Sequence, residues 1–407
     1  MPLTFLYTYA IIFKNQLVYC SFCGSAPRDI NKEIIVIELL YPKNGESISI
    51  LTDVQKDFIE RQERGEHTNW ETSYNWILEN YERHPDVFYI DDPNEANLTM
   101  PRYTEFAWKA DKPCRLVISR QGGDDYPGDP QEWEIVPAED RDGVSSATVG
   151  NFFARSNYSW KVVAMDGSEE SESRDFTTKD EFPRAIYGQG ASNIRDIGAL
   201  ERYDGKKLRQ GRIYRGTCFD SEIDREYLIS ERGKVALRDG LKIKTDLDIR
   251  HEAYGVLKSS MLGDTVRYHQ IVGKGHDEFY LEPEWGQCKA LVEFLADENN
   301  YPIYCHCMGG ADRTGTLIFL ISALTGVKTE MMIKDYNITS LTVLGLRCIT
   351  DVHQFEYSYF DGDWDGVEPI EVAAMRGSKK FLMEKCGVSE ETIERLRRNL
   401  IEGYEGE

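Results

Sequence analysis

Apolar stretches alternate with helical patterns in the part of the chain that follows Pro183. Three of them, at 242–249, 265–272 and 301–305, have the length of buried strands. Between the last two, apolar residues recur at helical spacing at Cys288, Leu291, Val292 and Leu295. Strands that alternate with helices are typical of a parallel sheet. Residues 181–407 are therefore expected to form an α/β domain, with a central, mostly parallel sheet flanked by helices.

A different pattern, of short strands separated by Gly, Asp and Pro, occupies residues 101–180. The clearest strands are 106–108, 116–118 and 158–163. Such a pattern predicts an all-β sandwich module. With Trp108 early, Trp160 late and a closing strand at 176–178, the stretch resembles a fibronectin type III-like module. In such modules these aromatics are core residues, and the module serves as a spacer or holds a protein partner.

The region 31–100 is predicted to be a small α+β segment. An apolar run at 33–40 reads as a strand, and the residues Thr52 and Gln55 have the spacing of a capping box that starts a helix. Three aromatic residues follow at Trp70, Tyr74 and Trp76. They are expected in the core, with an exposed binding patch as the alternative.

The first thirty residues, 1–30, are interpreted as a leader or possible signal peptide. Residues 1–13 are mostly apolar, and the small residues at 24–26 suit a cleavage site. We therefore expect export rather than a cytoplasmic location, and the alternative is an N-terminal strand. No run reaches the ~18 apolar residues of a membrane helix, so no integral span is expected.

Net charge narrows the range of partners. The chain of 407 residues carries a formal charge of -22. Nucleic acid is bound mainly by clustered Lys and Arg, so no nucleic-acid partner is expected. An acidic protein that handles an anionic ester needs a local positive pocket. A cluster of basic residues could form the rim of this pocket, and the alternative is a solvated hairpin tip. The cluster consists of Lys206, Lys207, Arg209 and Arg212.

The candidate chemistry lies in residues 304–315, which read as a strand, a tight loop and a helix. The loop stands at the N-terminus of that helix, where backbone N–H groups and the helix dipole favour an anion. Two glycines, Gly309 and Gly310, permit a close turn. We expect the loop backbone to surround a tetrahedral phosphate; the residues that would line it are Met308, Gly309, Gly310 and Ala311.

Within this loop, Cys307 precedes Arg313 by six positions, a spacing that suits a nucleophile and a phosphate-binding cation. Arginine offers planar, bidentate donors to phosphate oxygens. The same positive field lowers the pKa of the thiol, so that the thiolate attacks phosphorus and a phosphocysteine forms. The neighbouring Cys305 is expected to point into the core, with a redox partner for Cys307 as the alternative.

Several side chains are candidates for the remaining steps. The hydroxyl of Thr314 can donate to the Cys307 sulfur and ease its departure, and His306 is expected to orient the loop. The leaving group needs an acid, and the candidates are Asp312, Asp277 and Asp248. For Asp248 the alternative is an ion pair with Arg250, and for Asp277 it is an ordinary solvated acid. No metal or other cofactor is expected, because the gaps between these residues do not suit zinc.

The loop, His306-Cys307 to Arg313-Thr314, resembles that of the protein-tyrosine phosphatase superfamily. Its variant Cys-x-x-Gly-x-Asp-Arg-Thr-Gly looks like that of the bacterial tyrosine, dual-specificity and lipid phosphatase family. The resemblance extends in one order through segments at 193–198, 211–216, 245–250 and 335–337. It implies Asp312 as proton donor or positioner and Arg215 near the substrate entrance. Members often carry Lys where this chain has Ala311, which puts a preference for phosphoinositides in doubt.

These observations favour a phosphomonoester hydrolase that acts on phosphotyrosine, or with dual specificity, in a protein or a small ester. One alternative keeps the chemistry but takes phosphoinositides or inositol phosphates as substrate. Another, from a different class, is an adaptor that binds phosphate without catalysis. The intact Cys307, Arg313 and Thr314 argue against the adaptor, because a binder needs no nucleophile.

Overall fold

The structure is a computed structural model that describes most of the chain. The described residues are 10–11, 37–66, 75–76, 98–122, 132–136, 139–141, 143–221, 227–251, 257–342, 347 and 367–406. The predicted leader at 1–30 lies outside them, except for Ala10 and Ile11, which form strand β1.

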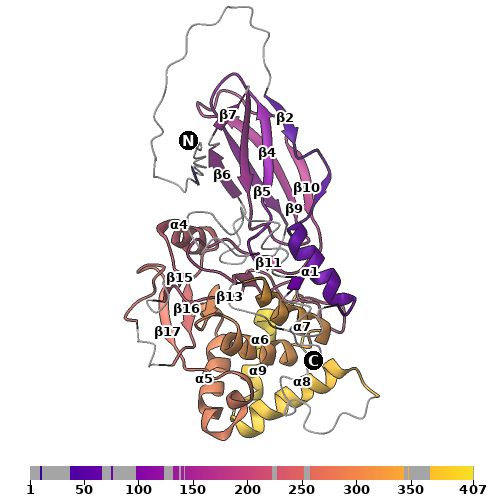
Figure 1. Ribbon diagram of the computed structural model, residues 1–407, viewed down its shortest axis with the longest axis vertical. Helices are drawn as coiled ribbons and strands as arrows, with labels where there is room; N and C mark the ends of the chain where they lie inside the picture. Colours follow the sequence, from indigo (N-terminus) through magenta and orange to yellow (C-terminus); the bar gives the residue numbers. More distant parts are fainter. Residues whose placement is uncertain are drawn as a thin grey trace, which may run out of the picture. The chain divides into compact units, whose positions relative to one another are not determined.

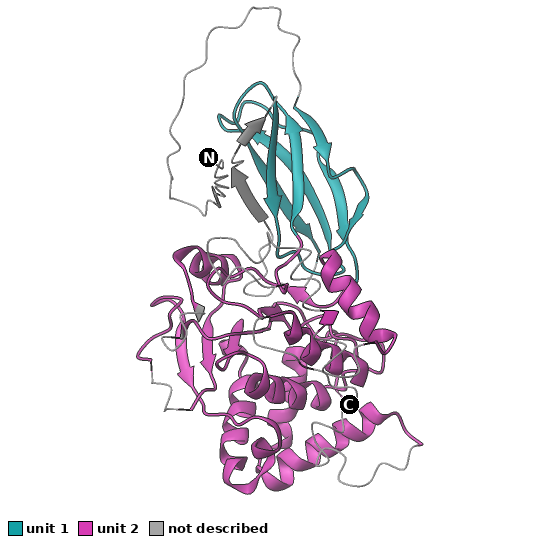
Figure 2. Cartoon of the chain, viewed as in Figure 1, with its two compact units in different colours: residues 1–50, 103–125, 130–180 teal, residues 51–102, 126–129, 181–407 magenta. Residues whose placement is uncertain are grey.

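The chain divides into two compact units (Figure 2). The first comprises residues 1–50, 103–125 and 130–180. The second comprises residues 51–102, 126–129 and 181–407. The segment 31–100, expected from the sequence to be one small region, is thus shared between the two units.

The first unit holds two β-sheets. One has the order β1 (Ala10–Ile11), β6 (Glu132–Val136), β5 (Cys114–Gln121), β9 (Asn157–Ala164), β10 (Arg174–Thr178), β3 (Glu46–Ile48). The other has the order β2 (Glu38–Tyr41), β4 (Thr104–Lys109), β8 (Val144–Val149), β7 (Glu139–Arg141). All pairings are antiparallel except that of β10 with β3. The predicted strands at 106–108, 116–118, 158–163 and 176–178 are all confirmed.

An aromatic core lies between these sheets. Phe106 on β4 packs edge-on against Trp160 and Phe176 of the other sheet, with ring centroids 5.3 and 5.6 Å apart. Trp108 and Trp160 are fully buried. Because rings from both sheets meet here, these aromatic residues act as core, as the resemblance to a fibronectin type III-like module implied.

Helix α1 (Asp53–Glu63) belongs to the second unit. Thr52 and Gln55 form the predicted capping box at its start. Its Phe58 packs on Trp76 at 5.2 Å, and both are buried in one cluster with Leu98, Ile338 and Leu341. An exposed aromatic patch is therefore wrong for Trp76. The other two members of that hypothesis, at positions 70 and 74, lie outside the described residues.

The central sheet of the second unit has the order β11 (Arg184–Ala185), β12 (Arg195–Asp196), β13 (Ile213–Gly216), β18 (Ile303–His306), β16 (Thr245–Asp248), β17 (Arg267–Gln270). The last four strands are parallel to one another. β11 and β12 pair antiparallel at one edge. The mostly parallel sheet predicted from the sequence is confirmed, and β18 lies inside it. A separate hairpin joins β14 (Asp220–Ser221) to β15 (Tyr227–Leu228).

Helices and turns surround this sheet (Figure 1). They are α4 (Glu231–Lys234), η1 (Val235–Gly240), η3 (His276–Tyr280), η4 (Glu282–Glu284), α5 (Trp285–Leu295), η5 (Glu298–Asn300), α6 (Asp312–Leu324), α7 (Thr329–Asn337), η6 (Ile338–Leu341), α8 (Ile370–Lys380), η9 (Phe381–Lys385) and α9 (Glu390–Leu400). Throughout the described ranges, none of them is long and apolar enough to cross a membrane.

Two hydrophobic clusters pack on opposite faces of the sheet, because successive strand residues point in opposite directions. Cys305 joins the larger cluster, which includes residues of α5, α6, α8 and α9. Tyr304 joins the smaller one, with Leu237 of η1 and Leu262. The Cys305 side chain is fully buried, as the core interpretation predicted.

Candidate active site

The loop from Cys307 to Ala311 connects the carboxyl end of β18 to the first residue of α6, Asp312. Gly310 turns with φ +62°, and a Cβ atom there would lie 2.0 Å from the Gly216 carbonyl oxygen. A side chain at this position would clash with the backbone of β13. The glycine is therefore required by the close approach of the two segments.

Every carbonyl of this loop accepts a hydrogen bond or polar contact from the surrounding protein. His306 Nδ1 lies 3.0 Å from the Cys307 oxygen, and the Cys218 N–H donates to the Met308 oxygen at 2.9 Å. Asn193 Nδ2 donates to the Gly309 oxygen at 3.1 Å. The remaining two oxygens, of Gly310 and Ala311, accept from Arg215 Nη2 at 2.6 and 3.2 Å.

These contacts fix the direction of the loop's N–H groups. In a trans peptide the C=O and N–H bonds point in opposite directions. With five successive carbonyls turned to the surrounding protein, the N–H groups of residues 308–312 face the other side. They form a row of donors at the N-terminus of α6, which is the arrangement that binds a tetrahedral anion.

The Cys307 sulfur lies within this row of donors, and only 3% of the residue is exposed. Burial raises the pKa of the thiol, but several groups together reverse that effect. They are the hydroxyl and N–H of Thr314, the Arg313 guanidinium and the Gly310 N–H. The net pKa of Cys307 is below that of an ordinary cysteine, which favours the thiolate.

His306 is a buried cation beneath the loop. Its Nε2 lies 3.0 Å from Asp246 Oδ1, and its Nδ1 lies 4.0 Å from Asp248 Oδ1. Burial lowers the pKa of the imidazole, but the two carboxylates outweigh burial and raise it to about 9. The ring is therefore protonated at neutral pH. With a proton on both nitrogens it donates to the Cys307 carbonyl, in agreement with an orienting rather than a proton-exchanging role.

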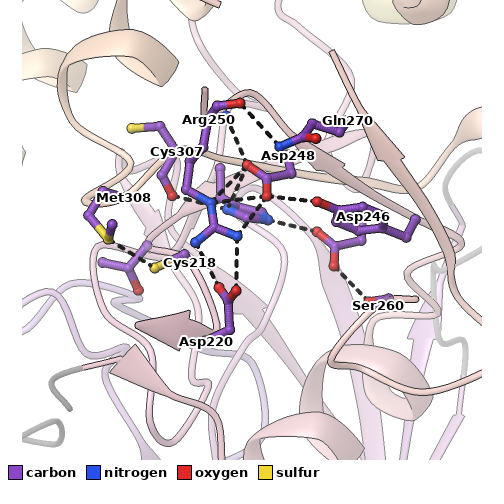
Figure 3. A network of polar contacts seen from close by, with 12 residues as sticks. Cys218, Asp220, Asp246, Asp248, Arg250, Ser260, Gln270, Cys307 and Met308 are labelled. Atoms are coloured by element: carbon purple, nitrogen blue, oxygen red, sulfur yellow. Dashed lines mark hydrogen bonds and ion pairs between the residues drawn. The ribbon is translucent and has the colours of Figure 1, made fainter. Parts of the chain in front are cut away.

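Asp248 belongs to an ion-pair network behind the loop (Figure 3). Its carboxylate pairs with Arg250 at 2.7 Å and accepts from the Tyr268 hydroxyl at 2.9 Å. Arg250 pairs in turn with Asp220 at 2.8 Å. Burial raises the pKa of Asp248, but His306 and Arg250 bring it below the usual value. The proposal that Asp248 protonates a leaving group is wrong, because its carboxylate is ionised and fully buried; the ion-pair alternative is confirmed.

Arg215 is also placed differently from the expectation. It is fully buried, pairs with Asp335 and donates to the carbonyls of Gly310 and Ala311. A position near the substrate entrance is therefore wrong for Arg215. It supports the loop from behind. Asp335 also pairs with Arg195 at 2.7 Å, and Arg195 Nη1 donates to Asn193 Oδ1 at 2.5 Å, so the residues that hold the loop are themselves connected.

The carboxylate of Asp312, on the first turn of α6, is held by several donors. Arg347 donates to it from Nε at 3.0 Å and from Nη2 at 2.9 Å, and the Tyr336 hydroxyl donates at 3.0 Å. His276 Nε2 lies 3.6 Å from Oδ1. Burial raises the pKa of Asp312, but His276 and Arg347 outweigh it and hold the pKa well below its usual range.

The segment from Gly275 to Asp277 lies beside the first turn of α6, next to Arg313. A Cβ atom on Gly275 would lie 3.5 Å from both the backbone nitrogen and Cγ of Arg313. Asp277 is exposed at the start of η3, next to His276. Four of the candidates, Cys307, Asp312, Arg313 and Thr314, thus lie together on the loop and the first turn of α6. Asp277 follows His276, whose ring lies 3.6 Å from Asp312.

The basic cluster at residues 206–212 lies away from this neighbourhood. It precedes β13, whose carboxyl end, at Gly216, aligns with the end of β18 that carries the loop. Arg209 Nε donates to the Ile401 carbonyl at 2.9 Å, and Lys206 Nζ donates to the Gly403 carbonyl at 3.3 Å. A rim around the phosphate site is therefore wrong for this cluster. The positive field at the loop comes from Arg313, His306 and the helix N-terminus instead.

Sequence reasoning missed several residues of the site. His276 and Arg347 stand in segments that carry no motif. Asn193, Asp335 and Tyr336 do lie in the short segments that supported the family resemblance, and that position was the available signal. Among the described residues, no three His, Cys, Asp or Glu side chains gather as a metal site would require.

Comparison with known protein families identifies the family of this chain. The sequence pattern of the Tyrosine phosphatase family matches residues 186–402, more than half of the chain. A solved structure, the core catalytic domain of the PP-IP phosphatase SIW14 from S. cerevisiae in complex with citrate, is 19% identical with a TM-score of 0.25. That match covers 42% of this chain and 93% of that one. No curated protein matches. The chain belongs to the tyrosine phosphatase family, whose members are phosphoric monoester hydrolases.

Proposed function

We propose that the protein hydrolyses phosphotyrosine, or phosphomonoesters with dual specificity, through a phosphocysteine on Cys307. The observation that carries the proposal is the set of five loop carbonyls held from outside, which turns a row of N–H groups toward one anion site beside the thiolate. Arg313 lies on the first turn of α6, directly after this loop, and offers bidentate donors to phosphate.

Each residue of the loop has a role in the proposed reaction. The Cys307 thiolate attacks phosphorus while the N–H groups and Arg313 stabilise the charge on the equatorial oxygens. Thr314, whose hydroxyl helps to lower the pKa of the Cys307 thiol, stabilises the thiolate when water later cleaves the S–P bond. His306 and Arg215 keep the loop in shape without contact to the substrate.

The direct test is turnover of an aryl phosphate by Cys307→Ser and by the wild type, with and without a chelator. The proposal predicts loss of turnover in the variant and no effect of the chelator. Wild-type rates in Cys307→Ser, or activity that needs a divalent metal, would contradict it. Tight vanadate binding without phosphate release by the wild type would instead favour a binding adaptor.

Substrate preference within this class follows from the pocket. Ala311, which is buried, provides no cation where related loops often carry Lys. Polyanionic headgroups gain less from such a loop, so we place phosphoinositides and inositol phosphates second to phosphotyrosine. A panel of phosphopeptides, phosphoinositides and inositol phosphates tests this order, and a higher kcat/KM on the polyanionic esters would reverse it.

We further propose that residues 101–180 form a fibronectin type III-like module that holds a protein partner. The two mostly antiparallel sheets and the aromatic core around Trp160 support this. Strands β2 and β3, from before residue 101, complete the two sheets. The test uses the purified Cys307→Ser variant to capture proteins from phosphorylated and from dephosphorylated extracts. A partner of the module is captured from both extracts, whereas a trapped substrate is captured only from the phosphorylated one.

A further inference from the structure

The proposed reaction needs a proton for the leaving oxygen, and Asp312 is poorly suited to supply it. Its carboxylate accepts from both Arg347 and Tyr336, and the imidazole of His276 lies 3.6 Å away. A carboxyl group surrounded by a guanidinium and other donors is stabilised without its proton. Asp312 is therefore an anchor in this arrangement, and the acid has to be another group.

His276 is fixed beside the catalytic loop by its backbone. Its N–H donates to Thr316 Oγ1 at 2.9 Å, and that hydroxyl donates to the Asp312 carbonyl at 2.8 Å. The preceding residue, Gly275, contacts Arg313. The imidazole thus stands over the first turn of α6, and its side chain is 56% exposed. It is open to an incoming ester.

The backbone of His276 has a second unusual feature. Its φ is +54°, in the left-handed region that L-residues with a side chain seldom adopt. Such conformations cost free energy and cluster at functional sites. The residue in this conformation carries the imidazole that lies 3.6 Å from Asp312.

We propose that His276 is the general acid and base of the proposed phosphatase reaction, and that Asp312 orients its ring. The inference rests on the proposed function. Asp312 would then be a positioning residue, with one ring nitrogen of His276 facing its carboxylate and the other facing the leaving oxygen.

The charges around His276 agree with this role. Asp312 raises the pKa of the imidazole, and burial lowers it. Arg347 also lowers this pKa and Asp277 raises it, so that the net shift is upward. Lys274, on the same segment, lies 3.6 Å from Glu278. The ring is therefore held more strongly in its protonated form than an ordinary surface histidine.

The two steps balance as follows. As the Cys307 sulfur forms its bond to phosphorus, the bond from phosphorus to the leaving oxygen breaks and the imidazolium proton moves to that oxygen. Neutral His276 then takes a proton from water while the water oxygen attacks phosphorus and the S–P bond breaks. Thiolate and imidazolium are regenerated, and the products are an alcohol or phenol and inorganic phosphate.

The test compares two esters, phosphotyrosine and a nitrophenyl phosphate, whose leaving group is stable without a proton. His276→Gln is expected to lower kcat on phosphotyrosine by about 100-fold and to slow the nitrophenyl ester much less. His269→Gln, the same change on β17 where the ring packs on Phe294, serves as the control and should alter neither. Equal slowing of both esters by His276→Gln would overturn the proposal.

Two further variants separate His276 from its neighbours. Asp312→Asn should move the basic limb of kcat to lower pH by about one unit, because the imidazolium loses its partner. It should add little to the loss already caused by His276→Gln. If Asp277→Asn gives the leaving-group-dependent loss while His276→Gln does not, Asp277 is the acid and the proposal fails. Failure of the proposed function itself gives a different result: Cys307→Ser would then retain turnover of the aryl phosphate.

Discussion

At the scale of single residues, the site depends on charges that are kept in a buried setting by their partners. Asp246 and Asp248 keep His306 protonated, and Arg313 with Thr314 lowers the pKa of Cys307 and so favours its thiolate. Each pair would be unfavourable if one partner were removed, because a buried charge would then remain alone. The residues therefore act as sets, and single substitutions are expected to have large effects.

Arg313→Lys is expected to lower kcat/KM for an aryl phosphate by about 10²- to 10³-fold, because a lysine cannot donate in bidentate fashion to the equatorial oxygens. Arg238→Lys, in a part-buried pair with Asp239 on η1, is a matched control that should leave kcat/KM unchanged. Unaltered catalytic efficiency in Arg313→Lys would show that Arg313 does not bind the transferred phosphoryl group.

The His306 cation predicts a pH dependence of stability. Its folded pKa of about 9 lies above the ordinary 6.5. The stabilisation, about 3 kcal/mol, is complete below about pH 6.5 and is lost as pH rises through about 9. Urea unfolding at pH 6, 8 and 10 of the wild type and of His306→Gln measures it. The difference between the two proteins should shrink toward pH 10, and a constant difference would contradict a buried imidazolium.

At the scale of elements, the strand β18, the catalytic loop and helix α6 form one device. Partners on other segments hold the loop carbonyls, so that its N–H groups converge. The order of these three elements could be predicted, because the apolar runs and the glycines are local signals. Arg215 could not be placed, because whether a strand side chain faces the ligand or the back of the loop depends on the register with β18.

Asn193→Asp tests the support of the loop from behind. The change keeps an acceptor for Arg195 but removes the amide that donates to the Gly309 carbonyl. We expect kcat on an aryl phosphate to fall about tenfold, since a small shift of the N–H groups weakens their alignment. The melting temperature should change little, because the pair with Arg195 is kept. A normal kcat would mean that the loop keeps its shape without Asn193.

The identity of the general acid could not be predicted from the sequence. The residues alone do not rank Asp248, Asp277 and Asp312 as the acid, and only the family resemblance favours Asp312. Their environments differ only in the folded chain, where Arg250 neutralises the first and Arg347 the third. Arg347 lies 35 positions from Asp312 and carries no local signal. Long-range ion pairs of this kind decide whether a carboxyl group is protonated, and the spacing of residues along the sequence does not reveal them.

At the scale of the whole molecule, the catalytic unit includes a segment that lies in the chain between strands β3 and β4 of the first unit. Residues 51–102 are part of this unit. Phe58, Trp76 and Leu98 form a buried cluster with Ile338 and Leu341, which follow α7. Thr99 accepts a hydrogen bond from the Asn193 N–H at 3.2 Å, next to the catalytic loop. This attachment could not be predicted, because an apolar pattern does not identify the surface on which it packs.

Phe58→Ala is expected to destabilise the catalytic unit by about 3–5 kcal/mol, because it leaves a cavity between Trp76 and the segment after α7. Thermal unfolding followed through loss of phosphatase activity measures the effect, and Ile59→Ala, at a partly buried position, is the milder control. If Phe58→Ala lost no thermal resistance of activity, residues 51–102 would fold independently of the catalytic unit.

The nucleophile and its anion site are tested most directly by the titration of Cys307, followed by its rate of alkylation with iodoacetamide between pH 4 and 10. The five anchored carbonyls and the groups around the sulfur predict a pKa clearly below about 8.5, the value of an ordinary cysteine. Vanadate should protect the thiolate from alkylation. A sulfur that titrates at or above the ordinary value, and that vanadate does not protect, would contradict the proposed nucleophile and its anion site.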